Sequence, residues 1–397
     1  MKPLVLSLLP RPPHPAREGA GIRNFHLLKA LTGSFRVRAV SLMPPGAEDL
    51  PWEFPDGVES SLIQLGGGPV RAVGSILRSL SGEPYVVAKY RSRTLDSEVR
   101  RVVAGEAPAW VIAHSYHVAP AALEADRPLW VDFHNVDSVI WQRLSRSAPS
   151  PFVRLATRWQ APLVERYEDS LYRRAAGFSA VSDLDADTMR SRSPGMSPIV
   201  VPNGVDLERY AFRPDPPDDQ ILLFVGDLRW HPNADGVAWF AKSVWPILRT
   251  AAPEARVELL GRGATDALLR LADDRLTFIG GVPDTRPAWS RAAIGIVPLL
   301  TGGGTRLKIL EGAAMGVPVV STSVGAEGLD LTSDDAIVIR DQPTEWAAAI
   351  AELLADRERR RRMAAVARSQ VEARYDWVAI GEAFARHLSD GMTDRDL

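Results

Sequence analysis

Residues 294–316 read Ile-Gly-Ile-Val-Pro-Leu-Leu-Thr-Gly-Gly-Gly-Thr-Arg-Leu-Lys-Ile-Leu-Glu-Gly-Ala-Ala-Met-Gly. This stretch predicts a buried strand over Ile294–Leu299, a glycine-rich loop, and a helix over Arg306–Met315. Glycines between a strand and a helix let backbone amides approach a ligand closely. The start of the helix adds unpaired N–H groups and a partial positive charge. The pattern is therefore typical of an α/β domain that binds phosphate groups at the end of a strand.

The charged residues of the same stretch indicate which ligand it binds. Arg306 and Lys308 lie in the first helical turn, where basic side chains are disfavoured unless an anion is present. Lys308 is one of only five lysines in the chain. Glu311 lies about one turn further on, where a carboxylate can accept both hydroxyls of a ribose. We expect a nucleoside diphosphate site here, and the alternative is a flexible loop followed by a solvated helix.

Outward from this stretch, short apolar runs alternate with helix-like segments. This rhythm predicts βαβ units and parallel sheets, whose strands are apolar on both faces because helices cover both sides. Strands are predicted over Pro3–Leu9, Arg36–Leu42, Ser61–Leu65, Trp110–His114, Leu129–Phe133, Gly177–Val181, Pro198–Val201, Ile221–Val225, Arg256–Leu260, Leu276–Ile279, Ile294–Leu299, Pro318–Thr322 and Ala336–Ile339. Further helices are predicted over Arg23–Leu31, Leu184–Arg190, Asp235–Thr250, Ala264–Ala272, Arg286–Ala293 and the tail Pro343–Leu397.

The rhythm restarts after residues 213–219, a Pro- and Asp-rich stretch that is typical of a linker. The expected fold class is therefore α/β, with two Rossmann-like doubly wound parallel-sheet domains at residues 1–203 and 204–376, followed by residues 377–397. Such sheets bind ligands at the carboxyl ends of their strands, so two of them predict a cleft between the domains.

Composition excludes several classes of function. The chain has 397 residues and no cysteine, which rules out disulfides, thiolate metal sites and a thiol nucleophile. A formal charge of −2 argues against a dedicated nucleic-acid partner. No apolar stretch is long enough to span a membrane. Prolines cut short the apolar run after Lys2, which favours a buried first strand over a signal peptide and predicts a cytoplasmic protein.

The glycine-rich stretch also carries a resemblance to a known family. Together with Gly316-Val-Pro-Val-Val-Ser-Thr-Ser-Val-Gly-Ala-Glu-Gly328, it resembles the donor-site signature of retaining family-four glycosyltransferases of the GT-B fold, in a branch associated with bacterial polysaccharide assembly. Further matches are Val201-Pro-Asn-Gly-Val-Asp206, Leu223-Phe-Val-Gly-Asp-Leu-Arg-Trp-His-Pro-Asn233, Gly19-Ala-Gly-Ile-Arg23 and Asp132-Phe-His-Asn135. The resemblance covers nearly the whole chain.

The resemblance implies an enzyme that moves a sugar from a nucleotide-diphosphate donor to an acceptor hydroxyl with retention of anomeric configuration. Residues 1–203 would bind the acceptor, which is a glycan, a lipid-linked molecule or a small molecule. Residues 204–376 would bind the donor, and the helix in 377–397 would cross back to the first domain. The nucleotide sugar is a co-substrate, so no separate cofactor is expected. Donor contacts are expected from Gly226, Gly302, Gly303, Gly304, Thr305 and Glu311.

Two positions depart from the family pattern. Gly303 stands where many members have the first glutamate of a pair, which contacts the donor sugar. Asp227 stands where many relatives have an arginine that holds the diphosphate. Leaving-group departure without a metal requires positive charge, so Arg229, Arg306 and Lys308 are the candidates that replace it.

Candidate catalytic residues in the first domain are His134, Gly19 and Gly21, with Lys308 from the second domain. His134 follows a predicted strand, and the resemblance places it near the donor sugar and acceptor. Its alternative is a buried structural histidine, and that of the glycines is an ordinary tight turn. The glycine pattern lacks the fingerprint of a dinucleotide-binding domain, which argues against a dehydrogenase.

Two further patterns have competing interpretations. Asp183-Leu-Asp-Ala-Asp187 has the spacing of some metal sites, but Ser182 in front of it predicts a helix cap with acids in the first turn. No metal is expected. The segment 141–174 interleaves arginines with aromatic residues, which is typical either of peripheral membrane contact or of a packed helix with a solvated basic face.

Two rival functions remain open at this point. One is an inverting GT-B transferase or a nucleotide-sugar epimerase, for which His114, His117 or Asp132 could serve as the general base. The other is a non-catalytic nucleotide-sugar-binding protein, because Gly303 and Asp227 replace usual family residues.

Overall fold

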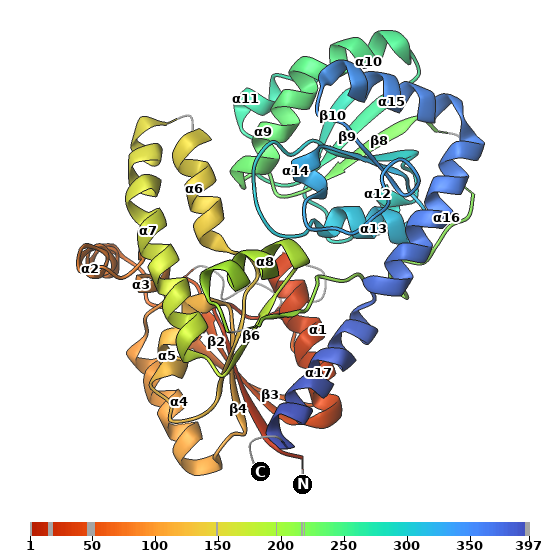
Figure 1. Cartoon of the computed structure of the whole chain (residues 1–397). Coiled ribbons are helices and arrows are strands. Elements are labelled where there is room, and N and C mark those ends of the chain that lie inside the picture. Colours follow the sequence, from red (N-terminus) through yellow and green to blue (C-terminus); the bar gives the residue numbers. More distant parts are fainter. Residues whose placement is uncertain are drawn as a thin grey trace. The chain divides into compact units, whose positions relative to one another are not determined.

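The structure is a computed structural model that describes residues 2–14, 19–45, 52–147, 150–195, 197–215, 217 and 219–393. The chain forms two compact units, and Figure 1 shows their elements. Unit 1 comprises Met1–Pro202 and Trp377–Leu397, and unit 2 comprises Asn203–Asp376. The boundary expected from the sequence, between residues 203 and 204, lies one residue after the boundary between Pro202 and Asn203 in the structure. Parts of three predicted segments, at 148–149, 216 and 218, and 394–397, lie outside the described residues.

Unit 1 is built on a seven-stranded parallel sheet with the order β3-β2-β1-β4-β5-β6-β7. The strands are β1 (Leu4–Leu9), β2 (Arg36–Met43), β3 (Val58–Gln64), β4 (Trp110–His114), β5 (Leu129–Asp132), β6 (Gly177–Ala180) and β7 (Ile199–Val200). Its helices are α1 (Gly19–Ser34), α2 (Pro69–Leu80), α3 (Tyr85–Ala88), α4 (Arg93–Glu106), the short 3₁₀ turn η1 (Tyr116–Val118), α5 (Ala119–Leu123), α6 (Asp137–Ser147), α7 (Pro151–Arg174), α8 (Asp183–Arg192) and α17 (Trp377–Thr393).

Unit 2 is built on a six-stranded parallel sheet with the order β10-β9-β8-β11-β12-β13. The strands are β8 (Ile221–Val225), β9 (Arg256–Leu260), β10 (Leu276–Gly280), β11 (Ile294–Val297), β12 (Val319–Ser321) and β13 (Ile337–Ile339). Its helices are α9 (His231–Trp239), the π-helical turn η2 (Phe240–Val244), α10 (Trp245–Ala251), α11 (Asp266–Leu269), α12 (Arg286–Trp289), α13 (Leu307–Met315), α14 (Ser323–Ala326), α15 (Pro343–Ala355) and α16 (Arg357–Arg374). The predicted fold class, two doubly wound parallel-sheet domains, is confirmed.

Strand β1 shows why these sheets form from continuous apolar runs. All six of its residues are buried. Because successive side chains of a strand point to opposite faces, Leu6 and Leu8 pack into one core while Val5 and Leu9 pack into a second core on the other face. A strand buried on both faces needs apolar residues at consecutive positions, which is the pattern that the sequence shows.

The helix predicted over 235–250 forms in three segments. Helix α9 begins four residues earlier, at His231, and η2 separates it from α10. Pro246 lies in the first turn of α10 and has no N–H to donate, so the backbone widens into a π turn just before it. The helices predicted over 264–272 and 286–293 are only four residues each, as α11 and α12.

The last helix, α17, packs within unit 1. The Trp377 ring stacks on His26 of α1 with ring centroids 5.1 Å apart. The indole Nε1 of Trp110 donates a hydrogen bond to the carbonyl of Leu388 at 3.1 Å. These contacts tie the end of the chain to α1 and β4, although more than 170 residues of unit 2 come between α17 and the rest of unit 1.

The strand orders place one switch point in each sheet. In unit 1, the connections leave in opposite directions on either side of the β1–β4 pair, and in unit 2 they do so at the β8–β11 pair. Ligands of doubly wound sheets bind beside the carboxyl ends of such strand pairs. The loops that follow β1, β4, β8 and β11 are therefore where a site is expected.

Candidate active site

The glycine-rich loop that connects β11 to α13 takes a backbone path that requires glycine. Gly302 has φ 127° and Gly304 has φ 70°, a region that L side chains rarely adopt. The buried Arg306 side chain donates hydrogen bonds back to the carbonyls of Gly303 and Gly304. Asn203 Nδ2 donates to Thr305 Oγ1 at 2.8 Å. Hydrogen bonds from the Arg306 and Asn203 side chains thus hold the loop in place.

Lys308 brings a cation to the carboxyl end of β8. Its Nζ donates to Asn233 Oδ1 at 2.9 Å and lies 4.2 Å from the ring centroid of Phe224. A Cβ added to Gly226 would lie 2.7 Å from this Nζ, so the amine occupies space that only a glycine leaves open. The residues that follow β8 and those that follow β11 therefore meet at the switch point of unit 2.

The environment of Lys308 makes its charge responsive to a ligand. Burial, together with the neighbouring positive charge of Arg306, lowers the pKa of Lys308 to about 7, and Glu311 opposes the shift. The amine is therefore only partly protonated at neutral pH. An anion bound beside it would favour the charged form and raise this pKa again.

Glu311 lies one turn further along α13 in a partly buried position. Trp289 Nε1 donates a hydrogen bond to its Oε2 at 3.3 Å. Burial raises the pKa of Glu311 above its usual value, and hydrogen bonds with Trp289 and Tyr210 oppose the shift. A carboxyl group whose ionised form is disfavoured by burial is typical of a functional position, because the same group at the surface would ionise without that penalty.

Asp227, which replaces the family's usual arginine, organises two other arginines. Its carboxylate pairs with Arg229, with Nη2 and Oδ2 2.5 Å apart, and with Arg262 Nε at 3.0 Å. Hydrogen bonds from Arg229 and from the Arg262 side chain, together with the charge of Arg229, lower the pKa of Asp227 to about 2. Arg229 is thus engaged with Asp227, whereas Lys308 is the predicted cation that lies against Gly226.

At the corresponding edge of unit 1, a buried ion pair links α1 to β5. Arg23 Nη2 lies 2.6 Å from Asp132 Oδ1, and its Nε donates to Oδ2 at 2.9 Å. The two side chains are only 1% and 0% exposed. Ser179 Oγ donates to Asp132 Oδ1 at 2.7 Å. Burial alone would raise the pKa of Asp132, but the charge and hydrogen bonds of Arg23 and the neighbouring His114 and His134 hold it well below its usual range.

This ion pair positions His134. The His134 Nε2 atom lies 3.3 Å from Asp132 Oδ2, and the imidazole is 16% exposed. The backbone places His134 two residues after the end of β5, at the carboxyl edge of the sheet. The ring therefore lies beside a fixed buried carboxylate, and a small part of the side chain stays exposed.

The two other histidines near this edge are held differently. His114 is fully buried, with its Nε2 3.3 Å from Ser7 Oγ, and burial lowers its pKa. His117 stacks on Tyr116 at 4.2 Å, and its Nδ1 lies 2.5 Å from Ser115 Oγ. Burial, followed by nearby positive charges, lowers the pKa of His117 to about 3.

Ser115 carries a strained backbone that the sequence does not reveal. Its φ is 112°, where a non-glycine residue is rare, and it comes directly after β4 at the switch point of unit 1. Because serine gives no hint of a positive φ, residue type alone could not have identified this position. Such strain is concentrated at functional sites, which supports a ligand site at this edge.

The two glycines predicted near the reaction centre begin α1. The carbonyl of Gly21 accepts a hydrogen bond from the His14 amide at 3.3 Å. A Cβ at Gly21 would make only ordinary contacts with His14, so the described structure itself does not require glycine there. Gly19 is exposed, and residues 15–18 just before it lie outside the described residues.

The predicted helix cap at Ser182 is confirmed. Its Oγ accepts a hydrogen bond from the Asp185 amide at 3.1 Å, and Asp183 and Asp185 lie in the first turn of α8. Within the part of the chain that the structure describes, no three His, Asp or Glu side chains are grouped to hold a metal ion.

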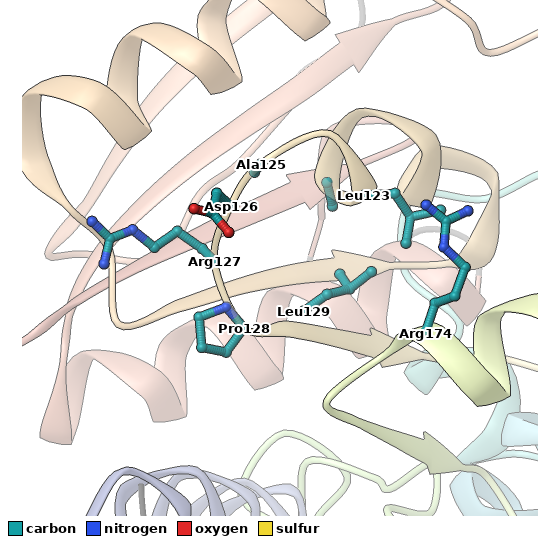
Figure 2. Close-up of a pocket in the computed structure, with 8 residues that line it drawn as sticks. Leu123, Ala125, Asp126, Arg127, Pro128, Leu129 and Arg174 are labelled. Carbon is teal, nitrogen blue, oxygen red and sulfur yellow. The ribbon is translucent and has the colours of Figure 1, made fainter. Parts of the chain in front are cut away.

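One pocket lies away from the predicted site. Figure 2 shows it at the connection from α5 to β5, with a cavity volume of about 310 Å³ and with Asp126, Arg127 and Arg174 around it. This connection precedes β5, so the pocket lies at the amino end of the strand. The carboxyl edge with His134 and Ser115 is at the other end.

Among the described residues, no helix combines the length and apolar composition that crossing a bilayer requires.

Known protein families match both halves of the chain. The family model described as Glycosyltransferase Family 4 matches residues 18–209, and the model described as Glycosyl transferases group 1 matches residues 219–356. The chain is 26% identical over 326 residues to a phosphatidyl-myo-inositol mannosyltransferase of Propionibacterium freudenreichii, which covers 72% of this chain and 78% of that protein. It is 29% identical over 248 residues to a GDP-mannose-dependent mannosyltransferase of Mycobacterium tuberculosis that acts on a phosphatidylinositol monomannoside, covering 55% and 64% of the two chains.

Solved structures share the fold over nearly the full length. The sucrose-phosphate synthase of Thermosynechococcus elongatus superposes with a TM-score of 0.74 at 18% identity, covering 98% of this chain and all of the other. The Anabaena protein HepE, solved in complex with UDP-glucose, gives a TM-score of 0.67 at 15% identity, covering 98% of this chain and all of the other. With both halves of the sequence matched by glycosyltransferase families and both sheets in place, the chain belongs to the glycosyltransferases of the GT-B fold.

Proposed function

We propose that this glycosyltransferase moves a hexose from a nucleotide-diphosphate donor to an acceptor hydroxyl with retention of anomeric configuration. The observation that carries the donor assignment is the Lys308 amine against Gly226, beside a loop in which two glycines adopt positive φ. This geometry places a cation and the backbone amides of the glycine-rich loop at the switch point of unit 2, where a diphosphate is favoured.

In this proposal each donor residue has one task. The amides of Gly302–Thr305 and the protonated Lys308 stabilise the negative charge that develops on the departing diphosphate. Arg306 acts indirectly, because its side chain is bonded to carbonyls of the loop and so fixes the direction of the amides. Glu311 accepts the ribose hydroxyls of the nucleotide. Asp227 pairs with Arg229 and Arg262 just after the carboxyl end of β8.

The side chains of unit 1 favour retention over an inverting mechanism. An inverting transferase needs a general base with a pKa near the working pH. Asp132 is engaged by Arg23 and its pKa is held well below the usual range, burial lowers the pKa of His114, and the pKa of His117 is lowered to about 3. All three candidates are therefore weak bases. Front-face attack assisted by the leaving phosphate needs no such base, which fits these groups.

The names of the relatives guide the choice of donor and acceptor. The relatives of known activity include mannosyltransferases that act on phosphatidylinositol derivatives, and HepE was solved with UDP-glucose. We therefore propose a nucleotide-hexose donor with uracil or guanine as the base and an acceptor that is a glycan or a lipid-linked molecule. The predicted cytoplasmic location stays a prediction.

A donor screen tests the proposal. The full chain is incubated with a panel of nucleotide hexoses, with and without candidate acceptors, and released nucleotide is quantified. Release with one donor, followed by NMR of the product with the anomeric configuration kept, is the expected result. An inverted product would replace retention with inversion, and tight donor binding without any release would favour a non-catalytic nucleotide-sugar-binding protein.

Replacing Glu311 with glutamine is expected to weaken nucleotide binding about 10- to 100-fold, because hydrogen bonds to a charged carboxylate contribute about 1.5–3 kcal/mol. The folded-state pKa of Glu311 is raised, so its ionised form disfavours folding at pH values above that pKa. The apo variant should therefore unfold at an equal or higher temperature than the wild type, with a larger gain at pH 8 than at pH 5. Calorimetric titration with UDP and GDP and thermal unfolding at both pH values measure these effects.

The exposed Glu345 on α15 provides the matched control as Glu345→Gln, which should leave both readouts unchanged. Wild-type nucleotide affinity in Glu311→Gln would remove Glu311 from the donor site.

Replacing His134 with alanine is expected to lower kcat about 10- to 100-fold while leaving nucleotide affinity and the unfolding midpoint close to wild type. The reason is that Asp132 keeps its bonds to Arg23 and Ser179, so the fold loses little while the acceptor side loses one polar group. Steady-state kinetics with the donor found in the screen measure this. The exposed His387→Ala serves as the control, and unaltered kcat in His134→Ala would show that the imidazole takes no part.

A further inference from the structure

Helix α2 has its apolar side facing outward. Five of its large apolar side chains are exposed, from 49% for Ile76 to 85% for Val70. The others are Val73, Leu77 and Leu80. Positions 70, 73, 77 and 80 are three or four residues apart and so form one stripe along the helix. A surface helix normally turns such a stripe toward the core, so this face is built to be covered by something outside the unit.

The inner side of α2 is polar and fixes this orientation. Arg71 Nη2 donates to the carbonyls of Lys89 and Arg91 at 2.7 and 2.8 Å. The buried Ser79 hydroxyl accepts a hydrogen bond from Gln160 Nε2 of α7 at 2.8 Å. Turning the apolar stripe inward would break these bonds and bury charge, so the outward orientation is the stable one.

A second apolar stripe lies on the neighbouring helix α7. Phe152, Leu155 and Trp159 are 85%, 69% and 44% exposed and are spaced at three and four residues. The Ser79–Gln160 bond places α7 directly against the end of α2, and Figure 1 shows the two helices side by side. We call the exposed stripes of α2 and α7 together the apolar face of unit 1.

The charges around this face select its partner. Residues 138–164 contribute four arginines, at positions 143, 146, 154 and 158, and contain no aspartate or glutamate. Helix α2 adds Arg78, which pairs with Glu83 at 3.8 Å. A second copy of the chain would bring the same arginines against these, so self-association through this face is disfavoured. An apolar surface with a predominantly basic surround complements the headgroups and acyl boundary of an anionic bilayer.

We propose that the apolar face of unit 1 is a membrane-docking surface that inserts α2 and the start of α7 into the interface of an anionic bilayer. Trp159 would lie at the headgroup level and the arginines would contact lipid phosphates. The segment 141–174, singled out from sequence for its arginines and aromatics, supplies one part of this surface. Helix α2 supplies the larger part, and the sequence alone did not predict a role for it. The inference is independent of the donor chemistry of unit 2.

Vesicle co-sedimentation of the full chain tests the proposal. Vesicles of phosphatidylcholine alone are compared with vesicles that contain 30% phosphatidylglycerol, at low and at high salt. We expect binding to the anionic vesicles that weakens with salt. In the variant Val73→Asp/Leu77→Asp, binding should fall at least tenfold, while nucleotide affinity and the unfolding midpoint stay at wild-type values because both side chains are already exposed. Leu269→Asp, at an exposed apolar position of unit 2, is the matched control and should bind as wild type.

The outcomes are distinct. Anionic vesicle binding that survives Val73→Asp/Leu77→Asp, or the absence of any vesicle binding by the wild type, would overturn the proposal. A wild-type dimer in light scattering that the double variant abolishes would overturn it in favour of a protein–protein interface. Wild-type binding to anionic vesicles by Val73→Leu/Leu77→Ile, which keeps the apolar character, would support it further. Donor release is measured separately, so failure of the proposed reaction leaves these results interpretable.

Discussion

Replacing Lys308 with methionine is expected to weaken binding of the nucleotide sugar by about 100-fold, the upper end of what a charged hydrogen bond contributes. Lys308 is the predicted cation whose amine lies against Gly226, and Arg229 is engaged by Asp227. Methionine keeps the length of the side chain and packs on Phe224. The unfolding free energy of the apo protein should therefore change by no more than about 1 kcal/mol.

The pH dependence of donor binding gives this prediction a second readout. With its pKa at about 7 in the free protein, Lys308 must take up a proton to bind the diphosphate above that pH. Affinity for the nucleotide sugar should then fall about tenfold per pH unit above 7 and level off below it. The phosphate diesters of a nucleotide sugar do not titrate in this range, so the slope belongs to the protein. Calorimetry in buffers of different ionisation enthalpy measures the proton uptake.

Lys308→Met should bind weakly at every pH and take up no proton. Lys242→Met, which removes an exposed lysine of the same unit, should retain wild-type affinity and wild-type proton uptake. Donor affinity that is flat from pH 6 to 9 in the wild type would show that Lys308 does not contact the diphosphate.

Replacing Arg23 with methionine is expected to lower the unfolding free energy by about 3–5 kcal/mol, because it leaves the fully buried Asp132 carboxylate without its counter-charge. In the wild type the pKa of Asp132 is depressed. The pair therefore contributes its full stability above the unfolded-state pKa and loses it only as pH falls through the folded-state value. In the variant, burial instead raises that pKa, so the penalty is present at pH 7 and is relieved as Asp132 becomes protonated at lower pH.

Urea denaturation at pH 7 and pH 5 measures the difference, which should narrow at pH 5. The double variant Arg23→Met/Asp132→Asn should be more stable at pH 7 than Arg23→Met, since it removes the unpaired charge. Arg190→Met breaks an exposed pair with Asp187 and should leave the midpoint unchanged. An Arg23→Met protein as stable as the wild type would mean that Asp132 finds another partner.

Local features of the chain were readable from sequence. The predicted bounds of β4, β8 and β9 match the structure residue for residue. Strand β8 is an unbroken apolar run, and β4 is apolar up to its last residue, as a strand covered on both faces requires. The loop with Gly302 and Gly304 was readable because few residues other than glycine tolerate positive φ. The family resemblance followed from ordered motifs along the whole chain, and the family models match both halves.

Other features depend on which distant segments the sheets bring together. Arg23 and Asp132 are 109 residues apart, and they pair because β1 and β5 lie in one sheet with α1 beside them. The pairing of Asp227 with Arg262, 35 residues further along the chain, and the outward face of α2 were equally hidden. In α2 the apolar stripe itself predicts burial, and only the bonds of Arg71 and Ser79 reveal that it faces outward.

The sequence by itself therefore determined the two parallel sheets and the glycine loop, and it predicted three candidate cations, since each depends on residues that are neighbours along the chain. The tertiary structure alone decided which cation lies at Gly226, which carboxylate supports His134, and which way α2 faces. These outcomes depend on strand order and on hydrogen bonds between residues far apart in sequence, and no local pattern of apolar or charged residues encodes them.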